Sequence, residues 1–447
     1  MAASGERRGE GGFTCLTVAL TLVLVIPDVQ YHIRTRRSSR PVGNVTSEEG
    51  ESHTVDRLLA AYRALRTAAP HGLPGALRAA LTRHYAVHGV EFRLVDYAMD
   101  ALRPAEGDAS GDAGVVSART GPAGRAFGSQ RPFVEPLDGP AGADPSALLT
   151  AHLPVSVRGN AVGVLTVRVP RDRLTADVIA ELGEIAEALG HAVAVADRDT
   201  DLYLRAGRTE RLTLAAEMQW QLLPGRSVSR PEFDLGGHLE PAYAIRGDVF
   251  DWSTSAEHLT LTVINGMGEG IEAALLTNLA VNALRNARRA GLGLAEQAYL
   301  ADQAVYGQYR GVAYVSALLL RFELATGLVT VIDAGSPRMW LRRRGRVELP
   351  PFDAQLPLGM FEDTEYRPER FRVEPGDRLF FLSDGVYDAA SPAGERYEEK
   401  ALARALSSTG LLPPGQVPRA VLEELARYRG GPSPEDDAMV VCLDWHG

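Results

Sequence analysis

The chain has 447 residues, 45% of them hydrophobic and 23% charged, with a formal net charge of -10 at pH 7. This length predicts two or three domains, and the acidic balance argues against a protein that grips nucleic acid through a basic face. The two cysteines, Cys15 and Cys442, cannot build a disulfide framework or a cysteine zinc site, and they favour a reducing cytoplasm.

The first fifty residues contain a short apolar run at 13–26. It is shorter than the roughly 20 residues that a membrane-spanning helix needs. Arg7 and Arg8 precede it as in a signal peptide, but no small-residue cleavage site follows. We therefore predict a disordered tail over residues 1–50 and a cytoplasmic protein outside the membrane, with an export or membrane role as the alternative.

Residues 51–195 combine helical and strand patterns. Apolar residues recur at helical spacing over 55–69 and 73–88, and residues 148–169 read as two strands joined at Gly159-Asn160. Helical periodicity then runs from 175 to about 223, with a weak break at 197–209. We predict a small α/β domain over 51–195 and a linker helix over 196–225.

An apolar stripe marks the helix that begins near residue 175. It consists of Leu182, Ile185, Leu189 and Val193. Such stripes pair helices of two chains in signalling proteins, so we predict a homodimer through the linker helix. The alternative is that the stripe packs on its own domain.

The second half of the chain, residues 226–447, alternates strands with helices. Strand patterns lie at 257–264, 313–323, 328–333, 378–382 and 438–443, and helical patterns at 271–289, 294–308, 395–407 and 416–429. Several strands follow one another over 313–349 without a helix between them, which favours antiparallel sheets.

Acidic residues lie beside strand ends at four places in this half. These places hold Asp248 with Asp251, Glu269 near Asn265, Asp384 with Asp388, and Glu435 with Asp436 and Asp437. If the four tips share one edge of a sandwich, their carboxylates form a pocket suited to hard divalent cations. Two such cations roughly 4 Å apart can activate a water for attack on phosphorus. The alternative for each residue is a solvated turn.

Seven segments between about 210 and 445 resemble, in order, the catalytic domain of the metal-dependent PPM-type serine/threonine phosphatases. The resemblance is closest to the bacterial branch that controls sporulation and sigma-factor regulators. The segments are EMQWQLLP, RGDVFD, NGMGEG, DAGSPRMWL, LPLG, EPGDRLFFLSDGVYDA and EDDAMVVCL. The stretch over which these segments are spread, from about 210 to 445, is about half of the chain.

The resemblance implies an α+β fold in which two antiparallel sheets are sandwiched between helices, with two Mn2+ or Mg2+ ions and an activated water at one edge. It assigns metal-ligand positions to Asp248, Asp384 and Asp436, and a backbone carbonyl contact to Gly266. Asp437 would replace Asp436 if the register shifts by one residue. Asp251 is expected to lie next to these ligands without binding a metal itself.

Asn265 falls on the aspartate that bridges both metals in the family, and we count it as a catalytic position with Asp248, Asp384 and Asp436. An amide offers one neutral oxygen and an NH2 donor, so the site loses a charge and its bridge together. Glu269 and Ser336 replace two family histidines, and Glu269 is a candidate to return a charge. We expect one metal at reduced affinity.

The resemblance then predicts a slow phosphatase acting on phosphoserine or phosphothreonine of a regulatory protein, such as an anti-sigma-factor antagonist. The alternative is an inactive pseudophosphatase that binds phosphoproteins or senses ligands. A nucleotide-binding turn at Gly266, Gly268 and Gly270 is disfavoured, because the glycines are evenly spaced and the following region is basic.

The front half, over about 55–195, loosely resembles a GAF-type sensory domain. The segments that carry this resemblance are GPAGRAFGSQRPFVEP and LPVSVRGNAVGVLTV. Domains of this type bind small ligands or dimerise, and the sequence nominates no ligand contacts.

Overall fold

The computed structural model describes residues 46–106, 113–135, 147–208, 212–240, 245–431 and 436–447. Residues Ser52–Gly447 form one compact unit. Residues 1–45 of the predicted tail lie outside the described residues, and helix α1 (Thr46–Thr67) begins inside the predicted range. In the described part of the chain, no helix has the length and apolarity needed to cross a membrane.

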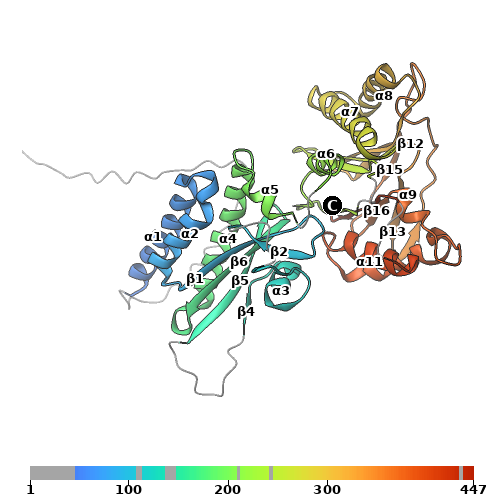
Figure 1. The fold of residues 1–447 in the computed structure, drawn as a ribbon. Helices are drawn as coiled ribbons and strands as arrows, with labels where there is room; N and C mark the ends of the chain where they lie inside the picture. The colour runs from blue at the N-terminus through green and yellow to red at the C-terminus, as the bar shows by residue number, and fades with distance from the viewer. Residues whose placement is uncertain (1–45, 107–112, 136–146, 209–211, 241–244, 432–435) are drawn as a thin grey trace, which may run out of the picture. The chain divides into compact units, whose positions relative to one another are not determined.

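The front half contains a six-stranded antiparallel sheet with the order β3-β2-β1-β6-β5-β4 (Figure 1). Its strands are β1 (Gly89–Val95), β2 (Ala101–Pro104), β3 (Val116–Ser117), β4 (Phe133–Val134), β5 (Leu148–Val157) and β6 (Asn160–Pro170). Its helices are α1, α2 (Leu73–Tyr85), α3 (Gly121–Ser129) and α4 (Ala176–Ala196), with short 3-10 turns at Pro70–Gly72 and Arg171–Arg173.

Both faces of this sheet are covered, because its strands alternate between two clusters of apolar side chains. On β6, Leu165 and Val167 join the cluster formed with α2 and α4, whereas Val164 joins the cluster with Phe127 of α3. The predicted hairpin is present as β5 and β6. Its two turn residues are Arg158 and Gly159, one position earlier than predicted. The predicted α/β unit is therefore observed, while its assignment to the GAF type stays a prediction.

The apolar stripe of α4 lies inside the chain. Leu182, Ile185 and Leu189 have no exposed surface, and Val193 is 3% exposed. They pack in the same cluster as α2 and β5, so the alternative of packing on its own domain describes the stripe. The buried stripe therefore does not support the predicted homodimer, which stays a prediction.

The predicted linker helix over 196–225 is not one helix in the described residues. The α4 helix ends at Ala196, and two short helices follow, α5 (Leu202–Ala206) and α6 (Leu214–Leu222). Thr200 accepts a hydrogen bond from the backbone N–H of Leu202, the local side-chain bonding that interrupts helices. The weak break predicted at 197–209 is a complete one.

The C-terminal half holds two antiparallel sheets, with the orders β15-β12-β11-β10-β9 and β14-β13-β16-β17-β8-β7. The first contains β9 (Val249–Thr254), β10 (His258–Gly266), β11 (Val315–Glu323), β12 (Leu328–Ala334) and β15 (Glu369–Arg372). The second contains β7 (Ser227–Arg230), β8 (Phe233–Glu240), β13 (Arg338–Arg343), β14 (Arg346–Glu348), β16 (Arg378–Leu382) and β17 (Ala438–Trp445).

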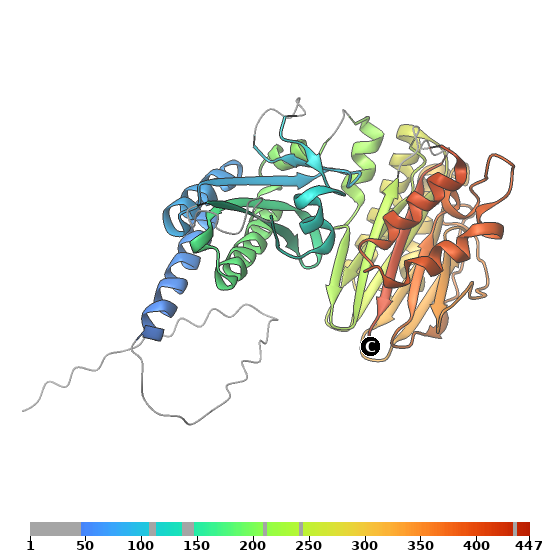
Figure 2. The same ribbon diagram turned by 90° about the horizontal axis from the view of Figure 1, so that it is seen from below.

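Helices cover the outer faces of both sheets. They are α7 (Gly270–Arg289) and α8 (Leu294–Tyr309) on the first sheet, and α10 (Ala403–Ser408) and α11 (Val417–Arg429) on the second. The short elements α9 (Asp384–Tyr387), Glu398–Leu402 and Thr409–Leu411 complete the chain. Figure 2 shows the last helices, in red, against the face of their sheet.

The main core lies between the two sheets. Leu261 of β10, Leu320 of β11, Phe381 of β16 and Val441 of β17 share one buried cluster there. The predicted α+β fold, with two antiparallel sheets sandwiched between helices, is confirmed for this half of the chain.

Substitution of Leu320 by alanine tests this core. Leu320 has no exposed surface, so Leu320→Ala is expected to lower the free energy of unfolding by about 2–5 kcal/mol through lost burial and a residual cavity. Urea denaturation measures the change. Val312→Ala, at a side chain that is 78% exposed, is the control and should change it by less than about 0.5 kcal/mol. Equal effects of the two variants would contradict the assigned core.

Candidate active site

The predicted site residues gather at one edge of the sandwich because of the antiparallel pairing. Asp248 precedes β9, and Val249 of that strand pairs with Ile264, next to Asn265 at the end of β10. In the other sheet, Asp384 follows β16 and Asp436 precedes β17, where Leu382 pairs with Val440. Two strand starts and two strand ends therefore meet at this edge. Glu435, also predicted there, lies outside the described residues.

Gly385 lets two of these tips approach each other. A Cβ atom at this position would lie 2.0 Å from the backbone oxygen of Asp437, a distance that no side chain tolerates. The glycine that follows Asp384 is thus required by the close contact between the ends of β16 and β17. This contact brings the carboxylates of Asp384 and Asp436 to one place.

Asp437 fixes the loop that carries Asp248. Its Oδ2 accepts hydrogen bonds from the backbone N–H groups of Arg246 (3.0 Å), Gly247 (3.0 Å) and Asp248 (3.3 Å). It also accepts one from Nε2 of Gln219, which donates to the backbone oxygen of Asp248 as well, both at 2.8 Å. Asp437 has no exposed surface and does not line the cavity at this edge, whereas Asp436 does. This arrangement favours Asp436 over Asp437 at the predicted ligand position.

The three predicted acidic ligands influence one another strongly. Burial raises the pKa of Asp248 well above its usual value, and the carboxylates of Asp437, Asp384 and Asp436 raise it further. Burial, followed by the charge of Asp384, raises the pKa of Asp436 to about 6. Burial also raises the pKa of Asp384. Oδ2 of Asp248 is buried without a hydrogen-bond partner. Such a cluster of uncompensated acids is suited to a cation.

Two other side chains partly neutralise this cluster. Nδ2 of Asn265 donates a hydrogen bond to Oδ1 of Asp384 at 2.5 Å. Nε of Arg246 lies 3.6 Å from Oδ1 of Asp436, and its charge lowers the pKa values of Asp436 and Asp384. At this edge, Asn265 contributes a neutral donor and Arg246 contributes a positive charge.

These contacts decide how well a divalent cation fits. The Asp248 oxygen without a hydrogen-bond partner in the described residues, together with the raised pKa values, is compatible with one cation. That Asp384, Asp436 and the carbonyl of Gly266 would hold it with Asp248 stays a prediction. These groups do not suit a bridged pair, because Asn265 presents a donor where the bridging carboxylate would stand. Within the described residues, no three His, Cys, Asp or Glu side chains already converge as a metal site.

A cavity of about 630 Å³ opens at this edge. Its walls include the carboxylates of Asp384 and Asp436 and the guanidinium groups of Arg246 and Arg429. Within the described residues, Nε of Arg246 and both Nε and Nη2 of Arg429 are buried without a hydrogen-bond partner, although Nε of Arg246 lies near Asp436. Guanidinium groups that line a cavity are suited to a phosphate group.

Three other candidates lie apart from the cavity. Asp251 is buried behind the edge and forms ion pairs with Arg285 (2.8 Å) and Arg288 (2.9 Å), which attach α7 to β9. Glu269 is exposed, and no hydrogen bond or ion pair of the described residues joins it to the acids. Ser336 forms a hydrogen bond with the hydroxyl of Tyr387 at 2.8 Å.

Sequence reasoning assigned no role to Gln219, Arg246 or Arg429. Gln219 and Arg246 stand inside two of the quoted motifs, so a signal was present, but their partners are distant in the chain. Arg429 ends α11, where a basic residue commonly stabilises the helix dipole, and the sequence offers no sign of its position in the cavity.

Removal of the Asp437 carboxylate tests its structural role. Asp437→Ala leaves three backbone donors and one amide donor unsatisfied, and each buried donor costs about 1–3 kcal/mol. The free energy of unfolding is therefore expected to fall by about 3 kcal/mol or more in urea denaturation. Asp353→Ala, at an exposed acid, should leave it within about 0.5 kcal/mol. A small loss in Asp437→Ala would show that the loop is held in another way.

Comparison with known proteins places this half of the chain in context. Residues 255–446 match the sequence profile of the family described as stage II sporulation protein E (SpoIIE). Two curated relatives come from Bacillus subtilis (strain 168). The phosphoserine phosphatase RsbU is 21% identical over 223 residues, which are 49% of this chain and 67% of RsbU. The phosphoserine phosphatase RsbP is 23% identical over 183 residues, which are 40% of this chain and 45% of RsbP.

Among solved structures, the PP2C phosphatase domain of SpoIIE from Bacillus subtilis, with a fragment of its regulatory domain, has 19% identity and a TM-score of 0.43. The match covers 48% of this chain and 64% of that chain. All three matches span only part of each protein, and the GAF-like domain gains no support from them. Residues 255–446 of the chain are therefore similar to the SpoIIE family.

Proposed function

We propose that this protein is a metal-dependent protein serine/threonine phosphatase of bacterial signalling. Its substrate would be phosphoserine or phosphothreonine on a regulatory protein, such as an anti-sigma-factor antagonist, in the cytoplasm. The observation that carries the proposal is the acid cluster of buried Asp248 and half-buried Asp384 and Asp436 beside the guanidinium groups of Arg246 and Arg429. The similarity to two phosphoserine phosphatases supports the reaction class.

The residues at this edge would have two roles, metal binding and phosphate binding. Asp248, Asp384 and Asp436, with the carbonyl of Gly266, would hold one Mn2+ or Mg2+ ion. A bound divalent cation supplies Lewis-acid chemistry at the phosphoryl group and activates water. Arg246 and Arg429 would orient the phosphate through guanidinium donors and offset its charge.

In this proposal, Asn265 limits the rate of phosphate-ester hydrolysis at the acidic edge. To admit a cation to Asp384, its amide has to give up the hydrogen bond to that carboxylate. The site then holds fewer negative charges than a carboxylate-bridged pair would provide. We therefore propose weak metal binding and slow turnover.

The second candidate function is phosphoprotein binding without turnover. It is favoured by the same two contacts, Asn265 to Asp384 and Arg246 to Asp436, because they occupy the carboxylates without a metal. In that case the arginines would bind the phosphate and no hydrolysis would follow.

Restoration of the carboxylate by Asn265→Asp distinguishes the two functions. The added charge is expected to tighten Mn2+ binding about tenfold or more, since one charged ligand contributes at least the roughly 1.4 kcal/mol that a factor of ten requires. Calorimetry measures the affinity, and hydrolysis of p-nitrophenyl phosphate and of a phosphoserine peptide measures turnover. Asn286→Asp, on the exposed side of α7, adds the same charge away from the edge and serves as the control.

Each outcome has a definite meaning. Metal-dependent turnover by the natural protein supports the phosphatase. Turnover by the Asn265→Asp variant alone supports the binding protein. If Asn265→Asp binds Mn2+ no better than Asn286→Asp, the proposed place of the cation is wrong.

The arginine role has its own test. Arg429→Met removes two unused donors from the cavity, so the dissociation constant of a phosphoserine peptide should rise about tenfold, the loss expected for charge-assisted hydrogen bonds. Calorimetry on metal-free protein measures it. Arg427→Met, at a side chain 70% exposed on the same helix, is the control. Equal affinities of the two variants would contradict the assignment of Arg429 to the phosphate.

A further inference from the structure

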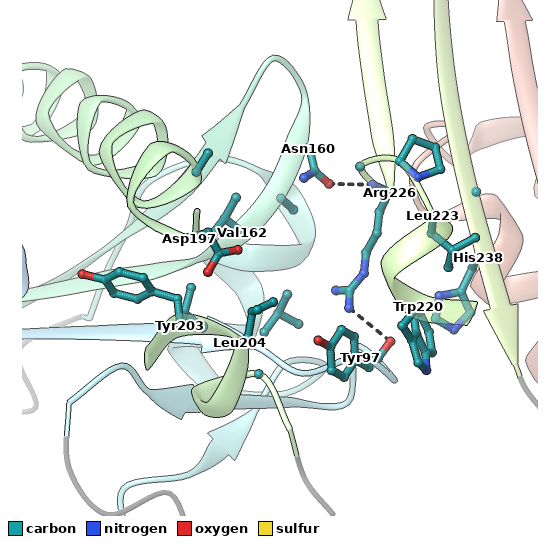
Figure 3. A pocket seen from close by; sticks show the side chains of 18 of the residues that line it. Tyr97, Asn160, Val162, Asp197, Tyr203, Leu204, Trp220, Leu223, Arg226 and His238 are labelled. Atoms are coloured by element: carbon teal, nitrogen blue, oxygen red, sulfur yellow. Dashed lines mark hydrogen bonds between the residues drawn. The ribbon is translucent and has the colours of Figure 1, made fainter. Parts of the chain in front are cut away.

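A second cavity, of about 310 Å³, lies away from the acidic edge within the compact unit 52–447 (Figure 3). Its walls come from β1 and β6 of the six-stranded sheet in the front half, from the helices α4, α5 and α6, and from β8. Most of them are apolar, and they include Val162, Leu204 and Leu223. Its volume is at the lower end of the range for small-molecule sites, about 300–1,000 Å³.

An arginine without an acidic partner reaches into this cavity. Nη2 of Arg226 donates to the backbone oxygens of Asp96 (2.7 Å) and Tyr97 (3.2 Å). No carboxylate of the described residues forms an ion pair with it, and Oδ1 of Asp96 instead accepts from the backbone of Asp100 and Ala101. Arg226 as a whole keeps some exposed surface, but desolvation around its guanidinium lowers its pKa to about 10. The charge of Asp96 offsets this desolvation only in part, and an anionic ligand in direct contact with the guanidinium would relieve the rest.

Two further polar side chains of the cavity lack partners. Oδ1 of Asp197, at the end of α4, is buried without a hydrogen bond, and Figure 3 shows Asp197 on the opposite side from Arg226. His238 is 8% exposed, and no hydrogen bond reaches it from the described residues. Burial, and then the charges of Arg226 and Arg419, lower the pKa of His238 to about 3, so its ring is neutral. These groups leave one acceptor and one neutral imidazole for a ligand.

An aromatic surface completes the cavity. Trp220 of α6 stacks on Tyr97 with ring centroids 4.9 Å apart and an interplanar angle of 29°. Both rings line the cavity, so a flat apolar body can lie against them. A bare inorganic anion would leave these apolar walls without a partner.

We propose that this cavity binds a small aromatic carboxylate that also carries one N–H or O–H donor. Its carboxylate pairs with Arg226, its ring lies among Leu204, Val162 and Trp220, and its donor is accepted by Asp197. The proposal does not depend on catalysis at the acidic edge, because it concerns a different cavity and different residues.

Three probes with the same ring test the chemistry on the full chain. They are indole-3-acetate with a carboxylate, tryptamine with an ammonium group, and uncharged indole. Isothermal calorimetry on metal-free protein measures their dissociation constants. Indole-3-acetate is expected to bind at least tenfold more tightly than the other two. Tighter binding of tryptamine, or no binding of any probe at millimolar concentration, would overturn the proposal.

Two variants locate the binding. Arg226→Gln should weaken indole-3-acetate at least tenfold and leave indole unchanged, whereas Arg344→Gln, at an exposed arginine, should change neither. Leu204→Trp should fill the cavity and remove all three probes while Arg226 is kept. If Arg226→Gln fails to fold, Leu204→Trp still tests whether the probes bind in this cavity. Unchanged binding by Leu204→Trp would show that the probes bind at another site and would overturn the proposal.

Discussion

The acidic edge depends on one carboxylate that takes no part in the proposed chemistry. Asp437 collects three consecutive backbone N–H groups of the loop before β9 and the amide of Gln219 on α6. One buried oxygen thus joins the start of β17, the loop of Asp248 and a helix more than 200 residues earlier in the chain. Since the loop cannot turn its N–H groups elsewhere without leaving them unsatisfied, Asp248 is directed toward the other acids despite their mutual repulsion.

Charge balance explains the rest of the edge. Burial raises the pKa values of Asp248, Asp384 and Asp436, and neighbouring carboxylates raise those of Asp248 and Asp436 further. Arg246 and the amide of Asn265 offset part of this rise. Both contacts come from within the chain, so a cation bound at Asp384 and Asp436 would compete with them. The same feature supports slow catalysis and phosphoprotein binding alike.

Much of this arrangement could be predicted from the sequence. The consecutive strand patterns predicted antiparallel sheets, and the resemblance to the PPM-type phosphatases implied that two of them form a sandwich. The acids beside strand ends predicted the shared edge, because antiparallel pairing places strand ends together. The linker helix could not be predicted correctly, because the break around Thr200 depends on local side-chain bonding that helical periodicity hides. The stripe of α4 has the same pattern whether it packs within one chain or between two. The roles of Gln219 and Arg429 depend on contacts between distant segments, which no local pattern records.

The way Asp437 holds its loop also determines where this edge can vary. Gly247 has a φ angle of +92°, and a Cβ atom there would lie 2.7 Å from Oγ1 of Thr277, so this position is restricted to glycine. At position 246, in contrast, Asp437 holds only the backbone N–H, and the side chain lines the cavity, where it pairs with Asp436. A single substitution at 246 can therefore change the chemistry of the edge without altering the path of its backbone. The side chain at position 246 can thus set the charge of this cavity independently of the loop that carries it, and in this chain that side chain is an arginine.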